Sequence, residues 1–327
     1  DQPNTLDTLK EAKRIYQDVL VKLPKNQRAI DGIKALAGGP VDKASKVQDP
    51  PANQQDSLIS FYSQGQLEQA LEQAYVLLQQ FPNSSFLYNI CGAVYKGLGQ
   101  LDASIEAYNK ALVLKPDFAE AYNNMGAALR VHGKLEEAIE AYTKALAIKP
   151  DFAEAYYNMG FALQEQGKLE EAIEAYTKAL AIKPDYAETY SNMGFALQDQ
   201  GKLEEAIEAF NKALVLKPDY AEVYYNMGLA LKEQGKLEEA IEACNKALAL
   251  KPDYAEAYNN MGATLQEQGK LEEAIEAYEK ALSIKPDYAE AYNNIGVIRQ
   301  GQGKLEEAIE AYNKAIALKP NSTDAHH

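Results

Sequence analysis

Apolar residues recur at helical spacing in two runs within the segment 153–186. The first run is Tyr156, Met159, Ala162 and Leu163, and the second is Leu169, Ala172, Ile173, Tyr176, Ala179 and Leu180. A period near 3.6 residues with apolar side chains on one face is typical of an amphipathic α-helix. The pattern therefore predicts two amphipathic helices in this segment.

Turn and cap residues predict where these helices end. Gly167 separates the two runs, and glycine is favoured just past a helix C-terminus. Pro184 cannot continue the second helix, and Asp185 with Glu188 has the spacing of a capping box for the helix that follows.

The same unit recurs along the chain every 34 residues. The segment Gly-Lys-Leu-Glu-Glu-Ala-Ile-Glu-Ala returns at this interval, and extending its register backwards gives eight units without insertion or deletion. The units, numbered 1 to 8 below, are 51–84, 85–118, 119–152, 153–186, 187–220, 221–254, 255–288 and 289–322. The chain is therefore predicted to be an array of helix pairs.

Small residues mark the places where two helices approach closely. Glycines recur on the first helix, at Gly126, Gly160, Gly194, Gly228, Gly262 and Gly296. Alanines recur on the second, at Ala138, Ala172, Ala206, Ala240, Ala274 and Ala308. A large side chain at these positions would push the helices apart.

These residues resemble the tetratricopeptide-repeat motif. The family pattern Trp-x2-Leu-Gly-x2-Tyr, then Ala-x3-Phe, then Pro, corresponds to Tyr156-x2-Met159-Gly160-x2-Leu163, then Ala172-x3-Tyr176, then Pro184. The departures keep apolar bulk at each place. The resemblance implies an all-α fold, a right-handed superhelical solenoid whose first helices line a concave groove.

The pattern is interrupted at both ends. Residues 1–37 are interpreted as a degenerate helical pair, and 38–50 as a linker bounded by glycines and prolines. Unit 1 is atypical and is expected to cap the stack. Residues 323–327 are interpreted as a remnant of truncation or of a tag, which would leave Ile309, Tyr312 and Ile316 uncovered.

Charge and hydropathy narrow the classes of partner. The formal net charge is −15, from 33 Lys and Arg against 48 Asp and Glu, which disfavours binding to a phosphate backbone. No apolar run is long enough to span a membrane. We therefore expect a cytoplasmic protein that does not bind nucleic acid and does not span a membrane.

The sequence predicts neither catalysis nor a bound metal or cofactor. Cys91 and Cys244 replace apolar residues of the repeat and are interpreted as buried small hydrophobes. Only three histidines are present, and no phosphate-binding loop, Cys-x-x-Cys pair or hydrolase motif occurs. The Glu-Glu doublets that recur at the start of the second helices of units 3 to 8 are interpreted as helix N-terminal charge rather than as a catalytic pair.

A column of asparagines is the candidate binding element, with one residue per unit on the helix that lines the groove. Its members are Asn124, Asn158, Asn192, Asn226, Asn260 and Asn294. A carboxamide can bond both the C=O and the N–H of an extended peptide. The column is similar to that of the tetratricopeptide-repeat arm of O-linked N-acetylglucosamine transferase, which implies capture of a substrate backbone. The alternative is a family default that makes only local hydrogen bonds.

The groove next to this column varies between units and is most apolar in the middle. The candidates for seating an apolar side chain of a partner are Tyr157, Phe161, Phe195, Tyr225 and Leu229. The alternative is drift at tolerant surface positions. Tetratricopeptide-repeat co-chaperones bind the acidic C-terminus of heat-shock chaperones through clustered Lys and Arg on their first helices. The facing positions of this chain hold recurring glutamates, so that cluster is absent. We therefore expect a neutral or basic peptide.

The sequence therefore predicts a non-catalytic scaffold that binds a protein or an extended peptide segment over 119–296. Two alternatives stay open at this point. In the first, the array is the substrate-recruiting arm of a larger transferase, because it resembles the repeats that precede bacterial glycosyltransferase or sulfotransferase domains. In the other, the uncapped last unit docks on a second copy and forms a homo-oligomer.

Overall fold

The computed structural model describes residues 49–318. The chain divides into two units, Asp1–Gln48 and Asp49–His327, and all the described residues belong to the second. The predictions for 1–37, for most of the linker 38–50 and for the tail 323–327 lie outside the described residues.

Residues 49–318 form sixteen α-helices and no strand. The first helices of units 1 to 8 are α3 (Ala52–Ser63), α5 (Ser85–Gly97), α7 (Ala119–Val131), α9 (Ala153–Glu165), α11 (Ala187–Asp199), α13 (Ala221–Glu233), α15 (Ala255–Glu267) and α17 (Ala289–Gly301). The second helices are α4 (Leu67–Gln80), α6 (Leu101–Leu114), α8 (Leu135–Ile148), α10 (Leu169–Ile182), α12 (Leu203–Leu216), α14 (Leu237–Leu250), α16 (Leu271–Ile284) and α18 (Leu305–Leu318). The predicted all-α solenoid of helix pairs is confirmed.

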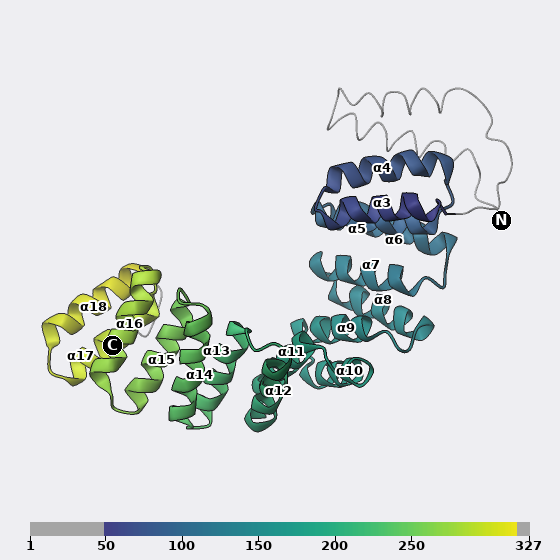
Figure 1. The fold of residues 1–327 in the computed structure, drawn as a ribbon. Coiled ribbons are helices and arrows are strands. Elements are labelled where there is room, and N and C mark those ends of the chain that lie inside the picture. Colours follow the sequence, from purple (N-terminus) through teal and green to yellow (C-terminus); the bar gives the residue numbers. More distant parts are fainter. Residues whose placement is uncertain (1–48, 319–327) are drawn as a thin grey trace, which may run out of the picture. The chain divides into compact units, whose positions relative to one another are not determined.

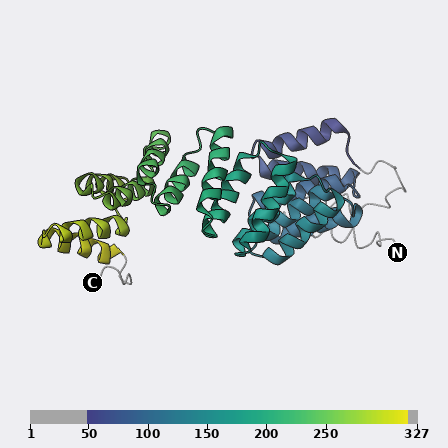
Figure 2. The ribbon, with the colours of Figure 1, turned by 90° about the horizontal axis from the view of Figure 1, so that it is seen from below.

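The helices pack in chain order, as Figures 1 and 2 show. The two helices of each unit pack on one another, and each second helix from α4 to α16 packs on the first helix of the next unit. From α5 to α17, first helices of successive units also contact one another, whereas the described second helices of neighbouring units make no comparable contact. The first helices therefore line the inner side of the array, which we call the concave face.

Gly167 ends α9 in the predicted way. Its φ of +76° lies in the left-handed region, which a residue with a Cβ enters only at a cost. The Lys168 N–H then donates to the Leu163 carbonyl at 2.9 Å, a bond that satisfies a free carbonyl at the helix C-terminus. Each described unit has a positive-φ glycine at this place.

The capping-box prediction for Asp185 and Glu188 is wrong. The residue at the N-cap of α11 is Tyr186, one place later than expected, and no side chain caps this helix. The Lys183 ammonium lies 4.4 Å from the centre of the Tyr186 ring, and the Tyr186 carbonyl accepts the Thr189 N–H at 3.1 Å. The connection between units is thus held by a packed aromatic residue and main-chain bonds.

The close approach predicted at the glycines is confirmed. In unit 4, Tyr176 is fully buried and its ring lies against Gly160, where an added Cβ would be 2.7 Å from Tyr176 Cε1. Tyr108, Tyr142, Phe210, Tyr278 and Tyr312 pack in the same way against the glycines of their own units. This aromatic–glycine contact sets the distance between the two helices of a unit.

Candidate functional site: the concave face

The asparagine column lies on the first helices α7 to α17, but its members are not equivalent. Asn124 Nδ2 donates to Asn89 Oδ1 at 3.1 Å, and Asn158 Nδ2 donates to Asn123 Oδ1 at 3.0 Å. Asn192 Nδ2 donates to the Tyr157 hydroxyl at 3.1 Å. In each pair the acceptor lies 35 residues earlier, on the first helix of the preceding unit. These three amides therefore tie neighbouring units together.

The same three asparagines keep a free acceptor at the surface. Asn124, Asn158 and Asn192 are each half-buried, and no hydrogen bond within residues 49–318 uses their Oδ1 atoms. The carboxamide can therefore accept an N–H from a partner while its own N–H₂ group stays bonded to the preceding unit.

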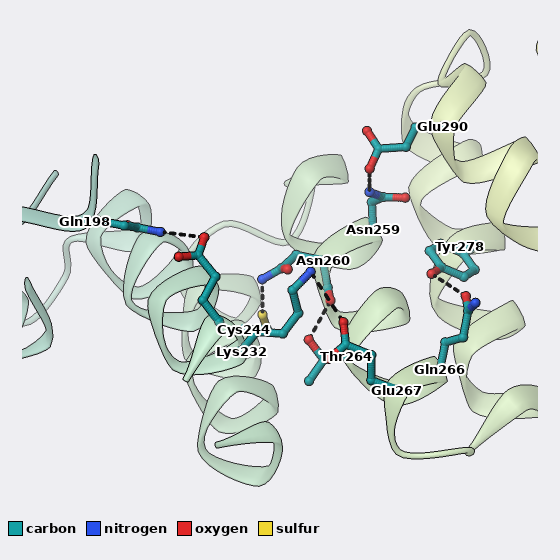
Figure 3. A network of polar contacts seen from close by, with 11 residues as sticks. Gln198, Lys232, Cys244, Asn259, Asn260, Thr264, Gln266, Glu267, Tyr278 and Glu290 are labelled. Atoms are coloured by element: carbon teal, nitrogen blue, oxygen red, sulfur yellow. Dashed lines mark hydrogen bonds and ion pairs between the residues drawn. The ribbon is translucent and has the colours of Figure 1, made fainter. Parts of the chain in front are cut away.

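Asn226 and Asn260 lie below the surface. Asn226 is 6% exposed and donates to the Glu222 carbonyl of its own helix at 2.5 Å. Asn260 is 4% exposed, and its Nδ2 donates to Cys244 Sγ at 3.4 Å. Figure 3 shows this bond. Both residues are thus almost fully enclosed, with their Nδ2 atoms bonded within the array, and the Asn260 Oδ1 is buried as well. Asn294, in the last unit, is again half-buried.

The predicted apolar residues lie together on α9, α11 and α13, and all five are half-buried. Tyr157 packs on Tyr186 at 5.0 Å between ring centres, and Tyr225 packs on Tyr254 at the same distance. Phe195 meets the buried Phe210 edge to face at 5.6 Å. The aromatic side chains are thus held by neighbours and present part of their surface to the groove.

Comparison with known families agrees with this geometry. The tetratricopeptide-repeat domain described as Cilia and flagella-associated protein 70 C-terminal domain matches residues 66–285, and a second family model, described as Tetratricopeptide repeat, matches residues 253–321. The chain belongs to the tetratricopeptide-repeat family.

Solved structures of tetratricopeptide-repeat proteins are similar to this array. MamA is 36% identical with a TM-score of 0.47, over 50% of this chain and 95% of that one. YrrB, whose crystal structure is described as that of a TPR protein with an unusual peptide-binding site, is 28% identical with a TM-score of 0.51, over 57% of this chain and 96% of that one. PilF of Pseudomonas aeruginosa is 24% identical with a TM-score of 0.55, over 64% of this chain and 95% of that one, and shares the fold. No curated protein matches the chain.

Sequence reasoning missed the residues that join one tetratricopeptide repeat to the next. Asn123 Nδ2 donates to Glu154 at 3.4 Å, and Asn259 Nδ2 donates to Glu290 at 3.0 Å, each on the following first helix. Both asparagines belong to the variable position that precedes the column. The sequence does contain these polar pairs, which are 31 and 35 residues apart. They can be recognised as hydrogen-bond partners only once the first helices are known to contact one another.

Cations interrupt the acidic edge near the N-terminal end of the concave face. The Arg130 guanidinium lies 4.6 Å from the centre of the Phe161 ring and pairs with Glu165 at 2.9 Å. Burial, and then the neighbouring Arg130, lower the pKa of Lys96. Glu120 and Glu256 are paired with Lys149 and Lys285, each at 3.2 Å. Two of the six glutamates that recur along this edge are thus paired with a lysine.

The two cysteines are buried, as predicted. Burial raises the pKa of Cys91 to about 12 and that of Cys244 to about 11, so both thiols are protonated at neutral pH. No group of three or more His, Cys, Asp or Glu side chains within 49–318 is placed to hold a metal ion. Over the same residues, none of the helices is long and apolar enough to cross a membrane.

Proposed function

We propose that the concave face of units 3 to 5 binds an extended peptide segment of a partner protein, without catalysis. The observation that carries this proposal is the set of three free Oδ1 acceptors, one per unit, at Asn124, Asn158 and Asn192. First helices about 10 Å apart match roughly three residues of extended chain per unit. The three acceptors would thus follow a peptide of about six or seven residues.

The apolar residues beside the acceptors would supply most of the affinity. Phe161 and Phe195 lie on the same helices as Asn158 and Asn192, at the centre of the face. Main-chain bonds hold a peptide without regard to its sequence, whereas an apolar seat selects its side chains. The similarity to YrrB supports this proposal, because that protein is itself described as having a peptide-binding site.

The paired substitution Phe161→Ala and Phe195→Ala tests the proposal. Short peptides are selected from a randomised display library on the wild-type protein, and we call these the selected peptides. Loss of two aromatic contacts is expected to weaken their binding by about tenfold or more. The matched control is Val113→Ala with Val215→Ala, which removes apolar side chains that are 78% and 80% exposed on the second helices. Equal affinity of both variants, or selection of no peptide at all, would contradict the proposal.

Self-association is a second candidate function, which an exposed apolar face on α18 favours. Leu305 and Ile309 are 61% and 59% exposed, whereas Ile275, the counterpart of Ile309 on α16, is buried. Docking of this face on a second copy would raise the mass in solution as the concentration rises. Light scattering on the wild type and on Leu305→Lys with Ile309→Lys measures this. We expect only the wild type to associate, and a constant monomer mass for it would remove this candidate.

A further inference from the structure

Unit 6 lacks the aromatic residue that fills every other described unit from 2 to 8. Cys244 stands where Tyr108, Tyr142, Tyr176, Phe210, Tyr278 and Tyr312 stand in those units. The glycine opposite them would place an added Cβ within 2.7 Å of the ring in each of the six. In unit 6 the corresponding distance, from Gly228 to Cys244 Sγ, is 3.1 Å. The thiol thus leaves unfilled much of the volume of a ring.

The Asn260 amide occupies part of that volume. Its Nδ2 lies 3.6 Å from the Cβ position built on Gly228 and donates to Cys244 Sγ at 3.4 Å. Its Oδ1 is buried without a hydrogen-bond partner. In Figure 3 the amide points from α15 towards the sulfur. The Asn260 side chain is therefore buried instead of lying at the surface, and one of its hydrogen-bonding atoms has no partner.

Unit 4 supplies an internal comparison. Tyr157 and Tyr225 hold the same place in units 4 and 6, and each precedes an asparagine of the column by 35 residues. With Tyr176 present, its ring lies 6.2 Å from that of Tyr157, and Asn192 donates to the Tyr157 hydroxyl.

In unit 6 the equivalent bond, from Asn260 to Tyr225, is replaced by the bond to Cys244. The replacement of the ring at Tyr176 by the thiol at Cys244 therefore accounts for the different positions of Asn192 and Asn260.

The buried Asn226, one unit before Asn260, has a separate cause. Asn226 follows Phe210, so the ring is present in unit 5, but the residue 35 places earlier is Ser191. This side chain is short and itself buried, and Asn226 bonds to its own helix instead. An asparagine thus stays at the surface when it has both a partner on the preceding first helix and a ring beneath it. Asn260 has the partner and lacks the ring.

We propose that Cys244 is the positioning residue that withdraws Asn260 from the concave face. Together with the withdrawal of Asn226, this ends the run of peptide-accessible acceptors at Asn192. The partner's backbone is then held over units 3 to 5, and units 6 and 7 contribute contacts that do not bond the main chain. This consequence for binding rests on the proposed function, whereas the placement of Asn260 does not.

Placement of the side chain is tested by NMR of the Asn side-chain amides. In Cys244→Tyr the Asn260 amide is expected to move to the surface, and exchange of its protons with solvent accelerates. Cys244→Phe should do the same, because the ring and not a hydroxyl excludes the amide. Cys244→Ala leaves the volume open and should keep Asn260 protected. An Asn260 amide that stays protected in both aromatic variants would overturn the proposal.

The reverse substitution is the second arm of this test. Tyr176→Cys opens the same volume in unit 4, so the Asn192 amide is expected to move inward and become protected. If Asn192 keeps its bond to Tyr157 in this variant, the ring does not determine the position of the asparagine and the proposal fails. Because one arm adds a ring and the other removes one, loss of stability alone cannot produce both expected results.

Binding separates this inference from the proposed function. Peptides are selected anew on Cys244→Tyr, and Asn260→Ala is made in that variant and in the wild type. We expect Asn260→Ala to weaken binding by about fivefold in the Cys244→Tyr protein and by less than about twofold in the wild type. If Asn158→Ala has no effect on the selected peptides, the proposed function fails while the NMR result still stands. Equal effects of Asn260→Ala in both backgrounds would contradict the role of Cys244 in binding.

Discussion

Gly160→Ala is expected to destabilise unit 4 by about 2 kcal/mol, whereas Gly228→Ala is expected to be close to neutral. At Gly160 the new Cβ would lie 2.7 Å from Tyr176 Cε1 and 3.2 Å from the Ala172 carbonyl oxygen. The ring is fully buried and cannot retreat, so the two helices must separate. At Gly228 the nearest atoms are Cys244 Sγ at 3.1 Å and the Ala240 carbonyl oxygen at 3.3 Å.

Both substitutions carry the same gain in helix propensity, about 1 kcal/mol, so their difference reports the contact with the ring. Urea unfolding combined with hydrogen exchange of the affected unit measures this difference, because a repeat array need not unfold as one cooperative block. In the Tyr176→Cys background the ring is absent. Adding Gly160→Ala to that variant should therefore cost much less stability than the same substitution costs in the wild type. Equal losses at Gly160 and Gly228 would show that the ring does not set the helix spacing.

The repeated positions made the fold predictable from the sequence. A period of 34 residues with Gly167 and Pro184 at fixed places predicted the helix pairs, and the recurring small residues predicted where the helices approach closely. Glu174 and Lys178, which are four residues apart on α10, also form an ion pair at 2.7 Å between exposed side chains. Such features depend on local sequence. Because the unit occurs eight times, the shared pattern can be recognised even where a single unit departs from it.

The positions of the asparagines could not be predicted in the same way. Their hydrogen bonds join residues 35 apart, so they depend on the distance between first helices and not on the local pattern. Ser191 and Cys244 each alter one of these bonds by being smaller than their counterparts in other units. The capping-box prediction at Asp185 was wrong because the turn between units is held by the packed ring of Tyr186 instead of by a side-chain cap. A six-membered column in sequence therefore becomes three consecutive surface acceptors in space.

Removal of those three acceptors is expected to have the largest effect on binding. Each bond to a peptide N–H contributes roughly 1 kcal/mol, so Asn124→Ala, Asn158→Ala and Asn192→Ala together should weaken the selected peptides by about 100-fold. Asn158→Asp retains an oxygen acceptor but not the amide donor, so it should lose less affinity than Asn158→Ala. Circular dichroism confirms that each variant keeps its helices, since the triple change also removes bonds between units.

The pair Asn226→Ala and Asn260→Ala provides the matched control for the triple variant. It removes two members of the same column, from the same place in their repeats, whose amides lie below the surface. We expect it to change peptide affinity by less than about threefold, within the usual effect of residues that do not contact a ligand.

The most direct measurement is therefore the affinity of one selected peptide for three proteins, by isothermal titration calorimetry: the wild type, the triple variant at Asn124, Asn158 and Asn192, and the pair variant at Asn226 and Asn260. Strong loss in the triple variant with near-wild-type binding in the pair is the result that this structure predicts. Unchanged affinity in the triple variant, or equal losses in both, would contradict capture of a peptide backbone by the surface asparagines.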